Sequence, residues 1–324
     1  MSTPDISVIM PTWNRAKYLP AALRTVLNQT IDANIEVIVA DDGSTDDTAE
    51  VVRRATADWP KNRTVRYLPL KKSGVCAARN AALDSTTAPI VAFLDSDDEW
   101  EQGKLEAQIA VLSDEVGLVH TDFRYIDSEG RFNDSGPQRP NNPARGECLN
   151  ALLAEDTIVF SSVLVRRAII DEVAVLEPHG LPFDPQWTNG QDYDLLLRIG
   201  LRTKFGYVSV PLTRYRTHNS QNAMGNLSRV FGFHCRVQMA FAERHCQDLG
   251  GLVVGQDAAR RFLLGRTKAH YWKRQLSTVR ELCDLADELQ LSNAEFSHMR
   301  RLSKVPMCLL RAKDSLDRLF GSKS

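Results

Sequence analysis

The segment Ile90-Val91-Ala92-Phe93-Leu94-Asp95-Ser96-Asp97-Asp98 joins five consecutive apolar residues to three carboxylates. A run of apolar residues without polar alternation is typical of a strand buried on both faces, as in the middle of a parallel sheet. In open sheets of this kind, ligands bind beyond the carboxyl ends of the strands. We therefore expect the acidic end of this segment to lie at a ligand-binding edge.

Three strand patterns precede this segment and alternate with amphipathic helical patterns. The strands are expected at residues 6–10, 35–40 and 65–68, and the helices around residues 19–27, from 44 to 55 and at 74–83. Such alternation predicts an α/β fold with a Rossmann-like, mostly parallel sheet flanked by helices. The first two strands end at Pro11-Thr12-Trp13 and at Asp41-Asp42, so we expect these residues at the same edge.

The rest of the chain divides into a less regular middle and a helical end. Strand patterns recur at residues 116–120, 160–165 and 205–210, a helix is expected to begin at Gln191, and three prolines within residues 137–143 indicate a loop. One apolar stripe near the end of the chain contains Val279, Leu282, Cys283, Ala286 and Leu289. We therefore divide the chain into residues 1–115, residues 116–224 and a helical region, residues 225–324.

The composition is that of a folded protein. Of 324 residues, 43% are hydrophobic and 25% charged, which excludes disordered, collagen-like and disulfide-scaffold classes. The net charge of −1 combines a net −8 over residues 1–224 with +7 over residues 225–324. An acidic first part disfavours nucleic acid as a partner and suits a divalent cation.

The last 25 residues carry seven basic and two acidic side chains. Among them stand the apolar residues Leu309, Leu316, Leu319 and Phe320, so this segment has the composition of a helix that lies on a membrane surface. The alternative that stays open is a helix that packs against the preceding domain or a second subunit.

The chain shows no sign of a secreted or membrane-spanning protein. Its longest apolar run has five residues, against the ~18 needed for a transmembrane helix, and its first residues lack a signal-peptide pattern. Six cysteines without a Cys-x-x-Cys pair fit free thiols in a reducing compartment. We expect a cytoplasmic location, with the inner face of the membrane as an alternative.

The pairs His234-Cys235 and His245-Cys246 repeat at a spacing of 11 residues. On a helix this spacing spans ~16 Å, whereas zinc lies ~2.0–2.3 Å from each of its ligands. We interpret these residues as packing or surface residues.

Oxygen ligands are what hard cations such as Mg²⁺ and Mn²⁺ prefer, and the Asp95-x-Asp97 pair supplies two carboxylates at the expected ligand edge. Asp98 is interpreted as the N-cap of a helix over residues 101–112. A phosphatase of the haloacid-dehalogenase type is excluded, because Ala40 stands at its nucleophile position. P-loop and dinucleotide-binding glycine motifs are absent.

Four segments now combine into one pattern: residues 6–15 (ISVIMPTWNR), 41–46 (DDGSTD), 74–80 (GVCAARN) and 93–98 (FLDSDD). In this order they resemble glycosyltransferase family 2, whose members have the GT-A fold. A looser similarity continues through residues 161–167, 183–184, 191–195 and 215–218, so the resemblance covers about residues 4–222. Residues 1–115 would then form the nucleotide-sugar-binding half and residues 116–224 the acceptor-binding half.

The resemblance implies an inverting transfer of a sugar from a nucleoside diphosphate, most often UDP, to an acceptor hydroxyl. Family members commonly require Mn²⁺ or Mg²⁺. At the family level the acceptor is a saccharide or a lipid-linked saccharide, and the process is bacterial surface polysaccharide synthesis. Partners would therefore be a nucleotide-sugar and such an acceptor, and no nucleic acid.

The family pattern assigns the donor site residue by residue. Pro11, Thr12 and Trp13 would form a wall around the base and ribose, and Asp42 would accept a hydrogen bond from the base. Further nucleotide contacts are implied for Arg79, Asp95 and Ser96. Simpler alternatives stay open, among them Trp13 as a core aromatic and Arg79 as the partner of a structural carboxylate.

Metal and base are also assigned through the resemblance. Asp97 would coordinate the cation, and His218 matches a late histidine that approaches the metal in some members. Asp192 would be the catalytic base that takes the acceptor proton, with Gln191 standing where Glu is more usual. Asp194 is the alternative base.

Two other functions compete with this hypothesis. The same fold could serve a nucleotide-binding or scaffold protein that has lost catalysis. A nucleotidyltransferase is disfavoured, because Pro11-Thr12-Trp13 is not the glycine- and lysine-rich loop that holds a triphosphate.

Overall fold

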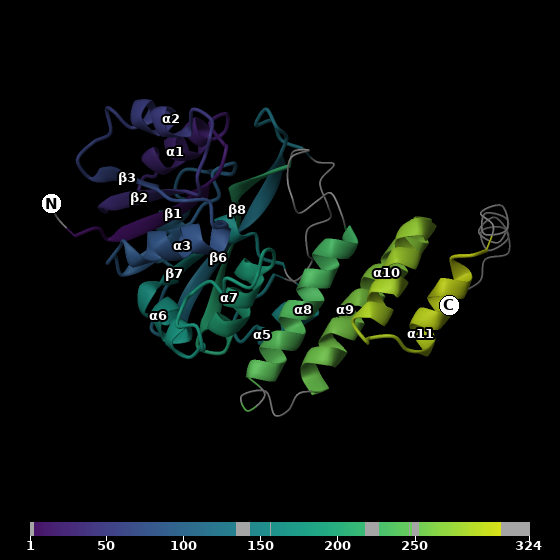
Figure 1. Cartoon of the computed structure of the whole chain (residues 1–324). Helices are drawn as coiled ribbons and strands as arrows, with labels where there is room; N and C mark the ends of the chain where they lie inside the picture. Colours follow the sequence, from purple (N-terminus) through teal and green to yellow (C-terminus); the bar gives the residue numbers. More distant parts are fainter. Residues whose placement is uncertain are drawn as a thin grey trace. The chain divides into compact units, whose positions relative to one another are not determined.

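The computed structural model describes residues 3–133, 143–155, 157–217, 227–245, 247 and 253–305 (Figure 1). The chain divides into two compact units, Met1–Gln221 and Asn222–Ser324. The sequence pattern placed the start of the helical region at residue 225. Residues 137–142 of the expected proline-rich loop, His218 and residues 306–324 of the basic segment lie outside the described residues.

The first unit is built on an eight-stranded sheet in the order β3-β2-β1-β4-β7-β6-β8-β5. Its strands are β1 (Ile6–Thr12), β2 (Ile35–Asp41), β3 (Arg63–Pro69), β4 (Ile90–Phe93), β5 (Glu99–Trp100), β6 (Val116–Ile126), β7 (Leu164–Arg166) and β8 (Lys204–Arg216). The strands β3, β2, β1 and β4 run parallel, and so do β6 and β8. Strand β7 is antiparallel to both of its neighbours, β4 and β6, and therefore joins the two parallel groups.

Helices cover both faces of the sheet. They are α1 (Leu19–Leu27), α2 (Thr48–Ala55), α3 (Val75–Asp84), α4 (Lys104–Ile109), α5 (Leu149–Ala154), α6 (Arg167–Val175) and α7 (Gln191–Gly200), with a 3₁₀ turn η1 (Phe160–Ser162). Helices α1 and α2 lie on one face of the strands β1 to β3, and α3 lies on the other (Figure 1). Strand β4 is central and its residues Val91 to Phe93 are buried, so the predicted α/β fold with a buried central strand is confirmed.

Side-chain hydrogen bonds explain where the elements differ from the sequence prediction. Helix α2 begins at Thr48 and not at Ser44, because Asp41 Oδ1 accepts the Ser44 N–H at 2.8 Å and the Ser44 hydroxyl accepts the Asn14 N–H at 2.8 Å. The expected strand 160–165 is the η1 turn followed by β7, since the Ser162 hydroxyl donates to Val159 O at 2.6 Å and turns the chain. The expected helix 101–112 is shortened to α4.

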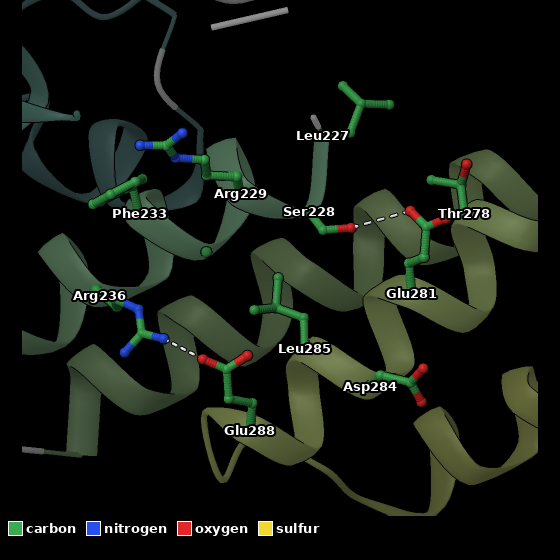
Figure 2. A pocket seen from close by; sticks show the side chains of 11 residues that line it. Leu227, Ser228, Arg229, Phe233, Arg236, Thr278, Glu281, Asp284, Leu285 and Glu288 are labelled. Carbon is green, nitrogen blue, oxygen red and sulfur yellow. Dashed lines mark hydrogen bonds and ion pairs between the residues drawn. The ribbon is translucent and has the colours of Figure 1, made fainter. Parts of the chain in front are cut away.

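The second unit consists of helices α8 (Leu227–Arg244), α9 (Val253–Trp272), α10 (Leu276–Glu288) and α11 (Ala294–Leu302). The predicted stripe of α10 is buried in its core. Asn293 caps α11 by accepting the N–H groups of Glu295 and Phe296. A groove of ≈ 970 Å³ between α8 and α10 has basic side chains on one wall, Arg229 and Arg236, and acidic ones on the other (Figure 2).

Packing explains the first histidine–cysteine pair. The His234 ring stacks on Phe262 with centroids 3.9 Å apart, and Cys235 is fully buried. Burial lowers the pKa of His234 to about 3, so the ring is neutral. Within the described part of the chain, no group of three His, Cys, Asp or Glu side chains is arranged to hold a metal ion, and no helix is long and apolar enough to cross a membrane.

Candidate active site

The carboxyl ends of β1, β2 and β4 meet at one edge of the sheet. Thr12 pairs with Asp41 across β1 and β2, and Ile9 pairs with Phe93 across β1 and β4. The Asp42 N–H donates to Thr12 O at 2.9 Å, so the two chain segments stay together past the ends of their strands. Because all three strands are parallel, the polar segments that follow them are brought together.

The adjacent carboxylates Asp41 and Asp42 have different partners. Asp41 accepts the Ser44 N–H and the Tyr67 hydroxyl, and thereby shapes its own turn. Asp42 is 4% exposed and accepts the Ser73 N–H at 2.6 Å and the Gly74 N–H at 3.0 Å. Asp42 thus fixes the segment that leads into α3 against the end of β2.

Trp13 lies at the surface of this edge and is not a core aromatic, since it is 44% exposed. The Lys72 ammonium lies 3.4 Å from the centroid of its indole ring and 2.9 Å from Asp42 Oδ2. Thr12 is buried beside it, and its hydroxyl makes no hydrogen bond within the described structure. The sequence analysis did not predict a role for Lys72, because its position depends on the Trp13 ring, which is distant in the sequence.

Arg79 of α3 contacts the acidic segment that follows β4. Its Nη2 donates to Asp95 Oδ1 at 2.7 Å, and its guanidinium lies over the rings of Phe160 and Phe183 at 4.8 and 5.4 Å. The side chain is almost fully buried, yet its Nε and Nη1 have no hydrogen-bond partner among the described residues. Two buried N–H donors next to Asp95 therefore have no partner among the described residues. The sequence analysis assigned no role to either aromatic residue.

The acidic segment itself contains three carboxylates with different surroundings. Desolvation raises the pKa of Asp95, the guanidinium of Arg79 lowers it, and the charges of Asp97 and Asp192 raise it further. Asp97 forms an ion pair with Arg15 Nε at 3.2 Å. Ser96 between them is buried.

Asp98 does not cap a helix, and this prediction was wrong. Its carboxylate accepts the Ser161 hydroxyl at 2.5 Å and the Arg216 N–H at 2.8 Å, both from distant parts of the chain. Desolvation, together with the charges of Asp97 and Asp95, raises its pKa well above the ordinary value. Arg216 also donates from Nε to Asp97 O at 2.6 Å, so Arg216 and Asp98 together fix the backbone of the acidic segment.

The donor set at this edge fits a hard divalent cation. Asp95 and Asp97 follow one strand with a single residue between them, and carboxylates are typical ligands of Mg²⁺ and Mn²⁺ when phosphate oxygens complete the shell. No third ligating side chain joins them in the described part of the chain, and His218 lies outside it. The residues therefore fit a cation that is held jointly with a phosphorylated substrate.

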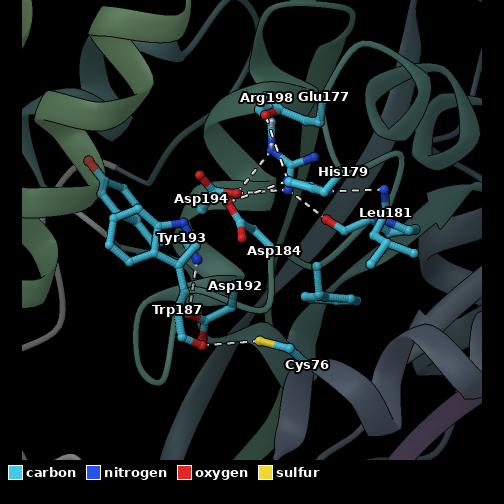
Figure 3. Close-up of polar contacts among 12 residues, drawn as sticks. Cys76, Glu177, His179, Leu181, Asp184, Trp187, Asp192, Tyr193, Asp194 and Arg198 are labelled. Carbon is cyan, nitrogen blue, oxygen red and sulfur yellow. Dashed lines mark hydrogen bonds and ion pairs between the residues drawn. The ribbon is translucent and has the colours of Figure 1, made fainter.

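Asp192 and Asp194 stand in the first turn of α7 and have unlike environments (Figure 3). Asp192 is partly exposed, accepts the Tyr193 N–H at 2.9 Å, and contributes its charge to the raised pKa of Asp95. Asp194 is fully buried and forms an ion pair with Arg198 at 2.7 Å. The predicted helix start at Gln191 is confirmed, and of the two carboxylates Asp192 is the accessible one.

Asp194 belongs to a polar cluster that also contains Arg198, Glu177, His179 and Asp184 (Figure 3). Arg198 also approaches Glu177 at 3.8 Å, and His179 Nε2 lies 3.3 Å from Asp184 Oδ2. The Leu181 N–H donates to His179 Nδ1 at 3.1 Å, so Nδ1 acts as an acceptor and Nε2 faces Asp184. Asp184 and Asp194 stand in the looser family resemblance, but the sequence did not predict their contacts with Arg198, Glu177 and His179, which fix the segment between α6 and α7.

The sheet order, the helices on both faces and the acidic edge define the class of protein, a glycosyltransferase of the GT-A type. Residues 7–173 match the family model for glycosyl transferase family 2, which is more than half of the chain. The chain belongs to this family, and the predicted resemblance is confirmed.

Relatives of the chain are named as glycosyltransferases. An uncharacterized glycosyltransferase of Rickettsia bellii is 28% identical over 222 residues, which cover 68% of this chain and 30% of the relative. An uncharacterized glycosyltransferase of Nostoc is 27% identical over 290 residues, 86% of this chain and 85% of the relative. The chain thus spans less than a third of the Rickettsia protein and most of the Nostoc protein.

Solved structures share the fold. S. aureus TarS 1-349 in complex with UDP-GlcNAc superposes with a TM-score of 0.64 at 18% identity, over 91% of this chain and 83% of that chain. The mannosyltransferase PcManGT from Pyrobaculum calidifontis, in complex with GDP-Man and Mn²⁺, gives a TM-score of 0.56 at 16% identity, over 98% of this chain and 81% of that one. At such identities the similarity shows the fold alone.

Proposed function

We propose that the chain is an inverting, metal-dependent glycosyltransferase that moves a sugar from a nucleoside diphosphate to an acceptor hydroxyl. The observation that carries this proposal is the meeting of Asp42, Asp95 and Asp97 at one sheet edge, where Arg79 Nη2 donates to Asp95 while the buried Nε and Nη1 of Arg79 have no hydrogen-bond partner among the described residues. Anionic and hydrogen-bonding groups of a nucleotide-sugar would find both carboxylate and guanidinium partners there. The fold-sharing structures in complex with UDP-GlcNAc and with GDP-Man support this substrate class.

In this proposal, Pro11, Thr12 and Trp13 border the base and ribose. Asp42 accepts a hydrogen bond from the base, while Arg79, Asp95 and Ser96 contact the rest of the nucleotide. UDP is the proposed carrier. Asp42 is buried, and its carboxylate is fixed before the nucleotide binds, because two backbone N–H groups already orient it.

The acceptor hydroxyl needs a base, since it is a poor nucleophile while it keeps its proton. Asp192 is the proposed base: it takes the proton as the acceptor oxygen bonds to the anomeric carbon, and the bond from that carbon to the diphosphate oxygen breaks. Attack opposite the leaving group inverts the anomeric configuration. The exposure of Asp192 and the electrostatic influence of Asp192 on Asp95 support a position next to the donor.

Asp97 is the proposed cation ligand, with His218 as a second. A bound Mn²⁺ or Mg²⁺ would neutralise the negative charge that develops on the departing diphosphate. Imidazole as a ligand would favour Mn²⁺. The pairing of Asp97 with Arg15 supports a site that carries balanced charge before any cation arrives.

The acceptor is proposed to be a saccharide or a lipid-linked saccharide of bacterial surface polysaccharide synthesis, bound by residues 116–224. A cytoplasmic protein that touches the membrane through its basic last residues would suit such an acceptor. The competing proposal is a catalytically inactive nucleotide-binding protein on the same fold. The accessible Asp192 favours the enzyme, because a scaffold has no need of a free carboxylate there.

Calorimetric binding of UDP, GDP and dTDP, each with Mn²⁺ and again with a chelator, tests the donor side. We expect one nucleotide to bind only with the metal. Release of free sugar from the matching nucleotide-sugar then tests the enzyme against the inactive scaffold. Binding without turnover would support the scaffold, and absence of binding by all three nucleotides would overturn both.

A further inference from the structure

Arg15 forms an ion pair with Asp97, the carboxylate that is the proposed cation ligand. Its Nε lies 3.2 Å from Asp97 Oδ2, and its Nη1 donates to Asn14 O at 3.4 Å. The side chain of Arg15 is 24% exposed and that of Asp97 is 16% exposed. Because both side chains are partly buried, salt and water screen their attraction less than at an open surface. One oxygen of the proposed ligand therefore already faces a positive charge that belongs to the chain.

The backbone on both sides of Arg15 is fixed to the turn that follows β2. Asn14 has φ 53° and donates its N–H to the Ser44 hydroxyl at 2.8 Å. The Ala16 N–H donates to Asp46 Oδ2 at 3.1 Å. A positive φ is uncommon for a residue with a side chain, although asparagine adopts it more readily than most residues. The position of the Arg15 guanidinium is thus a consequence of a preformed turn.

The backbone of Asp97 is fixed as well, since Arg216 Nε donates to Asp97 O at 2.6 Å. Each partner of the ion pair therefore stands on a segment that is held by other contacts. Forming the pair then costs less entropy than it would between two mobile side chains at the surface. The pair between Arg15 and Asp97 is for this reason a stable feature of the site before any ligand binds.

A guanidinium and a divalent cation compete for the same carboxylate. Both bind through carboxylate oxygens, and two positive charges at one carboxylate repel each other. A free cation must therefore displace Arg15 or share Asp97 with it. A cation on a nucleoside diphosphate differs, because the diphosphate carries more negative charge than one divalent cation neutralises. Arg15 attracts this anionic complex, and phosphate oxygens complete the ligand shell of the cation.

We propose that Arg15 is a tethered counter-cation, that is, a positive group of the chain that stands in for the cation at Asp97. The site then disfavours a free divalent cation and accepts the complex of cation and nucleoside diphosphate. This inference rests on the proposed function, because it uses the same Asp97. It adds to that function the residue that sets the order in which cation and nucleotide bind.

Binding of Mn²⁺ alone, without nucleotide, measures this competition directly. Mn²⁺ is titrated into each protein, and the free ion is followed by its electron paramagnetic resonance signal. We expect Arg15→Gln and Arg15→Met to bind Mn²⁺ about tenfold more tightly than the unchanged chain, since the hydrogen bond from Arg15 to a charged group no longer has to be broken. Arg15→Lys keeps the positive charge and should stay within about threefold of the unchanged chain. Arg24 is an exposed arginine of α1, and Arg24→Gln is the matched control that should leave the affinity unchanged.

The double variant Arg15→Gln/Asp97→Asn shows whether the gain comes from the ion pair, and we expect it to lose the gain. Equal Mn²⁺ affinity of Arg15→Gln and the unchanged chain would overturn the inference. A gain that persists in the double variant, or that also occurs in Arg24→Gln, would overturn it too, because it would then reflect overall charge. In these cases the proposed function stands if Mn²⁺ still increases the affinity of the unchanged chain for UDP, GDP or dTDP. If Mn²⁺ increases the affinity for none of the three, the proposed metal dependence is wrong and this inference fails with it.

Discussion

Asn80 and Phe183 are joined through both hydrogen-bonding groups of the asparagine amide. Asn80 Nδ2 donates to Phe183 O at 2.7 Å, and Asn80 Oδ1 accepts the Phe183 N–H at 2.9 Å. The ring of Phe183 in turn lies on the guanidinium of Arg79, the residue that binds Asp95. One turn earlier on α3, Cys76 Sγ donates to Trp187 O at 3.1 Å. Helix α3 thus connects the acidic edge of the sheet to the segment that leads to Asp192.

Changing Asn80 to Asp should loosen this connection. The variant places a carboxylate oxygen opposite the Phe183 carbonyl, which removes one hydrogen bond and adds repulsion worth ~1–3 kcal/mol. We expect faster hydrogen exchange over residues 183–192, no change in strands β1 and β2, and an about tenfold lower transfer rate. Asp84→Asn at the exposed end of α3 is the control. Unchanged exchange over residues 183–192 would show that the amide does not hold this segment.

Substitutions of Asp192 and Asp194 should affect different properties of the protein, turnover for Asp192 and stability for Asp194. Asp192→Asn should lower turnover by a factor of roughly 10²–10⁴, with little change in melting temperature or nucleotide affinity, because a general base contributes about this much. Asp194→Asn should instead destabilise the fold, since it leaves the buried Arg198 without its full counter-charge, at a cost of ~3–5 kcal/mol. Kinetics and thermal unfolding of both variants separate the two effects. Loss of turnover in a stable Asp194→Asn together with an active Asp192→Asn would make Asp194 the base.

Local patterns were enough to predict the sheet edge. The apolar runs that form β1, β2 and β4 lie within single short segments, so periodicity and the strand-end rule place Asp42, Asp95 and Asp97 without any knowledge of distant residues. The same reasoning failed for Asp98, which looks like a helix cap in the sequence. Its partners Ser161 and Arg216 stand 63 and 118 residues away, and no local pattern can report them.

The same limit explains the other residues that were missed. Lys72 has no motif of its own, and its place depends on Trp13 and Asp42 at the ends of two other strands. The buried cluster around Arg198 joins α7 to side chains of the preceding loop, and charged residues in a loop are usually exposed. Tertiary contacts therefore determine the roles of these residues, whereas the strands could be predicted from the local sequence.

Asp97→Asn should remove the metal dependence of nucleotide binding. The amide is a weaker cation ligand than the carboxylate, and it also leaves the partly buried Arg15 without its ion pair. We expect that adding Mn²⁺ no longer increases the affinity of the variant for the nucleoside diphosphate, whereas the unchanged chain gains at least about tenfold. Calorimetry with Mn²⁺ and with a chelator measures both. A variant that keeps its metal-dependent gain would show that the cation is bound elsewhere.

The buried ring of His234 should make the second unit sensitive to acid. Burial lowers its pKa from 6.5 to about 3, so the folded state resists protonation that the unfolded chain accepts. Stability from this residue is complete above pH 6.5 and is lost as the pH falls toward 3. At pH 5, which is 1.5 units below the unfolded-state pKa of 6.5, this contribution to the free energy of unfolding is lower by about 2 kcal/mol.

His234→Phe keeps a ring to stack on Phe262 and removes the titration. The decrease in unfolding free energy of α8 to α11 between pH 7 and pH 5, followed by hydrogen exchange, should therefore be about 2 kcal/mol smaller in this variant. His298, an exposed histidine on α11, provides the control, because His298→Gln leaves the acid sensitivity as it was. Equal acid sensitivity of His234→Phe and the unchanged chain would contradict the burial argument, since the proton would then be taken up elsewhere in the unit.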